Sequence, residues 1–138
     1  MKISNRFPNF IPAIKFTLDG LNYSLACNDA KKFSFMIPLA SHKKGLDFYE
    51  LEATPRGVFF TIETMLGFKS IKKTSSSIIT EDLTYEEWID VIFNIRSLHL
   101  RSEEYQALKQ GYVKTNSGCF GSFLLTFTFL LLWSLYLL

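Results

Sequence analysis

Two histidines are the side chains best suited to proton transfer, because imidazole is the side chain that titrates near neutral pH without a large shift. His42 follows Ser41 in a lysine-rich stretch. Adjacent residues rarely form a nucleophile and its base, and no acid stands nearby to orient the ring. His99 comes at the end of an expected helix, where a positively charged ring would complement the helix dipole. Neither histidine is therefore expected to be catalytic.

Other residue types that carry chemistry are also sparse. Glu86, Glu87 and Asp90 lie within about one helical turn, which is typical of a solvated face near a helix N-terminus. Cys27 and Cys119 are too few for a disulfide framework and lack the CxxC spacing of a zinc site. No phosphate-binding, nucleophile-elbow or metalloprotease motif occurs. We expect no catalytic residue, no cofactor and no metal, and hence a protein that is not an enzyme.

The distribution of charge gives little reason to expect nucleic-acid binding. The 15 Lys and Arg and the 13 Asp and Glu leave a net charge of +2. Residues 1–77 carry 11 basic and 6 acidic side chains, whereas residues 78–113 carry 3 basic and 7 acidic ones. Neither segment reaches the charge of a dedicated nucleic-acid binder, so no nucleic acid is expected as a partner.

The last part of the sequence carries the most specific signal. Residues 115–138 contain no charged side chain, and residues 118–138 include 8 Leu and 4 Phe. A helix of that length spans about 31 Å, which matches the hydrocarbon core of a bilayer. Its Leu and Phe side chains together favour insertion by about 5 kcal/mol. The pattern predicts a single-pass C-terminal transmembrane helix, anchored by Phe123, Leu124, Leu125, Phe127, Phe129, Leu130, Leu131, Leu132, Trp133, Leu135 and Tyr136.

Lysines beside this segment set its expected orientation. Positive residues stay on the cytoplasmic side of a membrane, so residues 1–114 should form a cytosolic domain and residues 115–138 its anchor. Membrane lipid is then an expected partner, with candidate headgroup contacts from Lys69, Lys72, Lys73, Lys109 and Lys114. Two alternatives are a soluble protein with a buried apolar C-terminus and a tail that derives from a truncated or alternatively read gene product.

Alternating apolar residues begin the expected sheet. Ile14, Phe16 and Leu18 alternate with polar residues, an Asp-Gly pair follows, and a second alternating run starts at Leu21. Two such runs joined by Asp-Gly predict a β-hairpin. Phe16 should therefore point into the core.

Further alternation continues this sheet to residue 72. It predicts strands at residues 32–39, 49–53 and 58–62, with a weaker signal at 68–71. In the run 58–62 the second apolar set, which includes Phe59, predicts a strand that is covered on both faces.

The remaining residues before the anchor read as a linker and two helices. Residues 73–83 are mostly polar and form the predicted linker. Thr84 and Glu87 match a capping box, and a second helix should start after Ser102 and end before Gly111. The predicted fold is α+β: an antiparallel meander of about five strands in residues 10–72, then two helices in residues 84–112 that cover one face. The predicted core includes Phe16, Phe35, Phe60, Trp88 and Ile92.

These features favour an accessory role over catalysis. We expect a tail-anchored, non-enzymatic protein whose cytosolic domain binds a protein partner at a membrane. Anchoring beside the partner raises the effective concentration, so a weakly binding domain suffices. The alternative from another class is a small membrane-associated enzyme or ligand-binding domain.

Overall fold

The computed structural model describes residues 1–111, and the predicted anchor lies outside the described residues. The chain divides into two units, Met1–Tyr105 and Gln106–Leu138. Within residues 1–111 no helix has the length and apolar character needed to cross a membrane.

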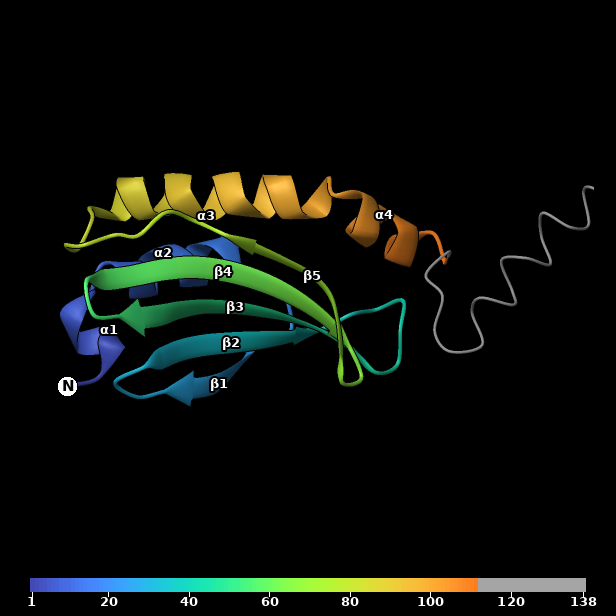
Figure 1. Ribbon diagram of the computed structural model, residues 1–138, viewed down its shortest axis with the longest axis horizontal. Helices are drawn as coiled ribbons and strands as arrows, with labels where there is room; N and C mark the ends of the chain where they lie inside the picture. Colours follow the sequence, from blue (N-terminus) through green and yellow to red (C-terminus); the bar gives the residue numbers. More distant parts are fainter. Residues whose placement is uncertain (112–138) are drawn as a thin grey trace, which may run out of the picture. The chain divides into compact units, whose positions relative to one another are not determined.

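A five-stranded antiparallel sheet forms the centre of the first unit (Figure 1). Its strands lie side by side in sequence order, which confirms the predicted α+β meander. Thr54 Oγ1 accepts the backbone N–H of Gly57 and so shapes the turn between the third and fourth strands. The strands are β1 (Ser24–Asn28), β2 (Lys32–Pro38), β3 (Gly45–Thr54), β4 (Gly57–Leu66) and β5 (Lys69–Ser75).

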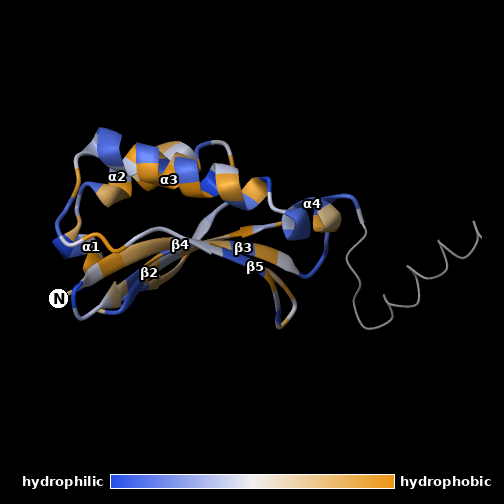
Figure 2. Cartoon of the chain, turned by 45° about the horizontal axis from the view of Figure 1, so that its top comes forward, coloured by the Kyte–Doolittle hydropathy of each residue, from blue (hydrophilic) through white to orange (hydrophobic). Residues whose placement is uncertain are grey.

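Helices precede and follow the sheet in the sequence. The helices of the described chain are α1 (Ile3–Arg6), α2 (Phe10–Thr17), α3 (Tyr85–Leu100) and α4 (Glu103–Lys109). α2 and α3 pack side by side over the strands (Figures 1 and 2). The predicted capping box starts α3, since Thr84 Oγ1 accepts the Glu87 N–H and Glu87 Oε1 accepts the Thr84 N–H.

The predicted first strand is wrong, because residues 10–17 form the helix α2. Its buried residues Phe10, Ala13 and Ile14 follow helical spacing, whereas Phe16 is 55% exposed and is not a core residue. The short alternation at residues 14–18 competed with this longer helical pattern, which begins at Phe10. Pro12 lies in the first turn, where its missing N–H does not break the helix.

The predicted hairpin at residues 19–20 is also wrong, although a turn is present there. Gly20 adopts a φ of +85°, a conformation that glycine tolerates because it lacks a Cβ, and the turn joins α2 to β1. The fifth strand of the sheet is β5, which forms where the sequence carries only a weak strand signal, at residues 68–71. It runs to Ser75, so the sheet extends into the predicted linker.

The core lies between the sheet and the helical layer. Phe35, Phe60, Trp88 and Ile92 are at most 4% exposed, as predicted. Phe10 takes the place that the sequence assigned to Phe16: its ring lies 5.0 Å from Trp88 and 5.9 Å from Phe60 between centroids.

Candidate functional site

Four polar side chains form a buried hydrogen-bonded chain between α3 and the sheet. Thr64 on β4 donates its hydroxyl to Asp47 Oδ1 on β3 over 2.6 Å. The same Thr64 Oγ1 lies 2.7 Å from His99 Nε2 near the end of α3. Thr74 Oγ1 on β5 lies 2.8 Å from His99 Nδ1. The chain therefore ties one helix to three adjacent strands.

These hydrogen bonds fit a neutral histidine with its proton on Nε2. Thr64 gives its single hydroxyl proton to Asp47, so its oxygen accepts from the Nε2–H of His99. When the ring is neutral, Nδ1 carries no proton and accepts from the Thr74 hydroxyl. Burial, with the positive charge of Lys72, lowers the pKa of His99 to about 4. The prediction that a charged ring complements the helix dipole is thus wrong, because burial disfavours the charged form.

Two tyrosines and an arginine lie around the acidic end of this chain. Burial raises the pKa of Asp47, and hydrogen bonds from Thr64 and Tyr105 oppose that rise. Burial also raises the pKa of Tyr105 to about 12, and the charge of Asp47 adds to the effect. Arg96 Nε donates to the hydroxyl oxygen of Tyr49 over 2.9 Å. The buried polar groups are thus paired with one another.

The order of the groups in the chain differs from that of a nucleophilic triad. In a triad the histidine lies between the hydroxyl and the carboxylate and removes the hydroxyl proton. Here Thr64 lies between Asp47 and His99, and its proton is already held by the carboxylate. The Thr64 oxygen is also engaged by both Asp47 and His99, which leaves no free position on it for a substrate. The geometry supports a structural network that holds α3 on the sheet.

A second group of polar side chains lies on the sheet face opposite α2 and α3, here named the uncovered face because these two helices do not cover it. Successive side chains of a strand point to opposite faces. Since the apolar neighbours of Ser34, Glu50 and Thr61 pack in the core, these three point to the uncovered face. The register aligns them in one row across β2, β3 and β4.

The flanking rows of the uncovered face contain longer side chains. One row consists of Lys32, Glu52 and Phe59, and the other of Met36, Phe48 and Glu63. They enclose the central row, in which Glu50 is 6% exposed and Thr61 is fully buried. Among the described residues, Thr61 Oγ1 has no hydrogen-bond partner.

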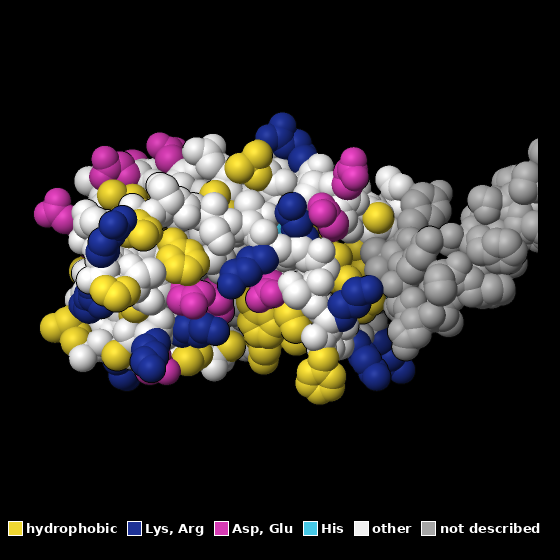
Figure 3. Space-filling model, in the orientation of Figure 1, with side chains coloured by type: hydrophobic (Ala, Val, Ile, Leu, Met, Phe, Trp, Pro, Cys, Tyr) yellow, Lys and Arg dark blue, Asp and Glu magenta, His cyan; other side chains and the backbone are white. Residues whose placement is uncertain are grey.

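Carboxylates outnumber ammonium groups on the uncovered face. Glu50 Oε2 lies 3.9 Å from Lys32 Nζ, and Glu52 Oε1 lies 3.9 Å from Lys73 Nζ. Both distances exceed the roughly 2.7–2.9 Å of a charge-assisted hydrogen bond. Burial raises the pKa of Glu50, and Lys32 opposes that rise. Figure 3 shows acidic and basic side chains beside a hydrophobic patch on this face.

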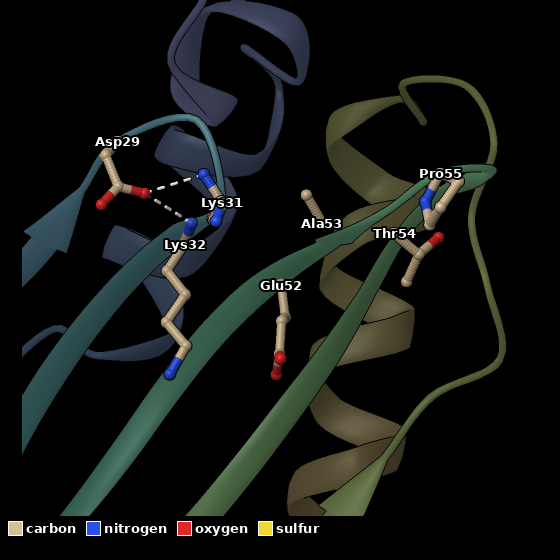
Figure 4. Close-up of a pocket in the computed structure, with 7 residues that line it drawn as sticks. All are labelled: Asp29, Lys31, Lys32, Glu52, Ala53, Thr54 and Pro55. Carbon is tan, nitrogen blue, oxygen red and sulfur yellow. Dashed lines mark hydrogen bonds between the residues drawn. The ribbon is translucent and has the colours of Figure 1, made fainter.

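An open pocket of about 500 Å³ lies at one end of the sheet (Figure 4). It is formed where the β1–β2 turn approaches the end of β3. Asp29 Oδ1 accepts the backbone N–H groups of Lys31 and Lys32, so this carboxylate shapes the turn. The pocket shares Lys32 and Glu52 with the uncovered face. Its lining residues are Asp29, Lys31, Lys32, Glu52, Ala53, Thr54 and Pro55.

The lysines of β5 that are predicted to contact headgroups do not share one face of the sheet. Lys72 Nζ lies 3.6 Å from Glu104 Oε1, whereas Lys73 reaches Glu52 on the uncovered face. Neighbouring strand positions thus place Lys72 and Lys73 on opposite faces. Lys69 and Lys109 are exposed, and Lys114 lies outside the described residues. Headgroup contact stays a prediction.

In the part of the chain that the structure describes, the other residues singled out by the sequence do not gather into a site. His42 Nδ1 lies 3.0 Å from the Ser41 hydroxyl in the loop before β3. Cys27 on β1 donates its thiol to Asp29 Oδ2 over 3.4 Å. In residues 1–111 no group of three His, Cys, Asp or Glu side chains is arranged to hold a metal ion.

Comparisons with protein-family models, curated proteins and solved structures found no match for this chain. The uncovered face and the apolar tail are therefore the features from which a function is inferred.

Proposed function

We propose that the chain is a tail-anchored, non-enzymatic accessory protein that binds a protein partner through the uncovered face. The observation that carries this proposal is the make-up of that face. Met36, Phe48 and Phe59 are half-buried there, in the rows on either side of the row that contains the unpaired hydroxyl of Thr61. An apolar patch rimmed by polar residues is typical of an interaction surface.

Anchoring by the apolar tail explains how so small a surface can be enough to bind a partner. A partner held on the same membrane is present at a high effective concentration, so each encounter needs only modest affinity. The uncharged residues 115–138 favour such anchoring, with the domain on the cytosolic side.

We predict that the full chain resists carbonate extraction from membranes, whereas a chain truncated after Thr115 is released. A variant of full length with Leu131→Lys and Leu132→Lys is the matched control. Each lysine near the centre of the span disfavours insertion by about 2.5–3.5 kcal/mol, so this variant should also be released. The anchor is ruled out if the unmodified full chain extracts as readily as the truncated one.

Site-specific photocrosslinking of the full chain in cellular membranes tests the interaction surface. A benzoyl-phenylalanine replaces either Phe48 or Phe59, and Phe93, which is 42% exposed on α3, provides the matched control position. We predict protein adducts of the same mass from positions 48 and 59, and none of that mass from position 93. Adducts from position 93 alone, or lipid adducts alone from positions 48 and 59, would contradict the proposal.

A further inference from the structure

We propose that the uncovered face recognises an arginine side chain of the protein partner, held between Glu50 and Thr61. This inference rests on the proposed function and specifies the chemistry of the partner. Glu50 and Thr61 face each other across β3 and β4 in the central row. Directly opposed strand residues have Cβ atoms about 4.5–5.5 Å apart, a separation that one guanidinium can bridge.

The unpaired hydroxyl of Thr61 is the first argument for a ligand. Buried polar groups normally have a hydrogen-bond partner, and an unsatisfied one costs free energy. Thr61 is fully buried, yet its Oγ1 has no partner within the part of the chain that the structure describes. Its side chain points away from the core, toward the uncovered face. A donor from a bound molecule would satisfy this oxygen.

The charge of the same region specifies a cationic donor. The uncovered face carries three carboxylates, those of Glu50, Glu52 and Glu63, against the ammonium groups of Lys32 and Lys73. One negative charge is left uncompensated. Because both internal ion pairs measure 3.9 Å, the carboxylates are not held in close hydrogen bonds by these lysines. A cation from the partner would bind there by charge complementarity.

The shape of the site favours arginine over lysine. A guanidinium presents several N–H donors in a planar fork, so it can donate to Glu50 and to Thr61 Oγ1 at once. It is also more weakly hydrated than an ammonium, which suits a carboxylate as buried as that of Glu50. The half-buried rings of Phe48 and Phe59 flank the row and can pack against the guanidinium or its aliphatic stem.

The test uses the full chain in lipid nanodiscs and three short, capped peptides that are identical except at the centre. The central residue is arginine, lysine or citrulline, the last being a neutral analogue of arginine. We expect saturable shifts of the backbone amide signals of Glu50 and Thr61 with the arginine peptide. The citrulline and lysine peptides should bind more weakly by about tenfold and severalfold, respectively. Equal binding of either control peptide would overturn the assignment.

Two substitutions separate recognition from folding. Glu50→Gln should weaken arginine-peptide binding about tenfold, whereas Glu86→Gln, on an exposed part of α3, should not change it. Thr61→Val removes the unpaired hydroxyl from a strand without a large change of shape. It should raise the midpoint of urea unfolding and yet weaken binding of the arginine peptide. If Thr61→Val or Glu50→Gln binds the peptide as tightly as the unmodified chain, the arginine site is wrong.

Failure of this site is distinguishable from failure of the proposed function. Photocrosslinks from positions 48 and 59, together with no preference for the arginine peptide, would keep the interaction surface and discard the arginine site. Loss of the crosslinks discards both.

Discussion

Replacing Phe60 with alanine should destabilise the domain by about 3–5 kcal/mol, the usual cost of removing a packed aromatic ring from a core. Phe60 is fully buried, and its ring centroid lies 5.9 Å from that of Phe10 and 6.2 Å from that of Tyr49. The substitution thus leaves a cavity between α2 and the sheet. Urea unfolding of the chain truncated after Thr115, followed by the fluorescence of Trp88, measures the loss.

Phe16→Ala is the matched control for this prediction. Phe16 has the same side chain but is 55% exposed, and its ring makes an edge contact with Tyr85 at 6.4 Å between centroids. Removing it should cost less than about 1 kcal/mol, as for most surface substitutions. A loss at Phe16 as large as that at Phe60 would place Phe16 in the core and would contradict the helical assignment of residues 10–17.

The contrast between these two phenylalanines shows what could and could not be predicted from the sequence. Phe60 belongs to a long alternating run whose neighbours Val58 and Ile62 share its face, so burial followed directly from the period of a strand. Phe16 belongs to a run that fits a strand over five residues and a helix from Phe10 onward. The packing of Phe10 against Trp88 favours the helix over the strand. Because this contact joins residues far apart in the sequence, the local pattern could not predict it.

The weak signal at residues 68–71 has a different physical origin. β5 is an edge strand rich in lysine, with Lys69, Lys72 and Lys73 along it. Charged edge strands discourage pairing with other chains, but the same residues dilute the apolar alternation by which a strand is predicted. The strand is specified mainly by its pairing with β4, through the turn at Gly67, where φ is +66°.

The alternation of apolar and polar residues could not predict which residues form the candidate site on the uncovered face. Ser34, Glu50 and Thr61 each occupy a polar position of a predicted strand, and nothing in the local sequence separates them from other solvated residues. They form a row only because the register of β2, β3 and β4 aligns them. Register depends on turn geometry and on the packing of the opposite face, which link distant parts of the chain.

One sequence feature did point to the uncovered face. Phe59 lies between Val58 and Phe60, and this doubled apolar pattern predicted a strand covered on both faces. The helices α2 and α3 cover one face of β4, while Phe59 on the other face is half-buried. Within the described residues the prediction therefore holds for one face only, and the proposed protein partner would cover the other.

Acidification should destabilise the domain through His99 by about 3 kcal/mol between the ordinary histidine pKa of 6.5 and the folded-state pKa of about 4. In this window the unfolded chain binds a proton at His99 and the folded chain does not, so protons favour unfolding. The contribution of His99 to stability is complete above pH 6.5 and declines as the pH falls toward 4. Urea unfolding as a function of pH measures it.

His99→Gln isolates this effect from that of the buried carboxyl groups. Burial raises the pKa of Asp47 and of Glu50, so the folded chain holds their protons more tightly than the unfolded one. Acidification is therefore stabilising at these two groups, opposite in sign to its effect at His99.

The His99→Gln variant is expected to be less stable near neutral pH, because glutamine cannot reproduce both hydrogen bonds to Thr64 and Thr74 at the same geometry. Its deficit relative to the unmodified chain should shrink as the pH falls from 6.5 to 4. A deficit that stays constant across this range would show that His99 titrates alike in the folded and unfolded chains, and the neutral, doubly hydrogen-bonded ring would then be wrong.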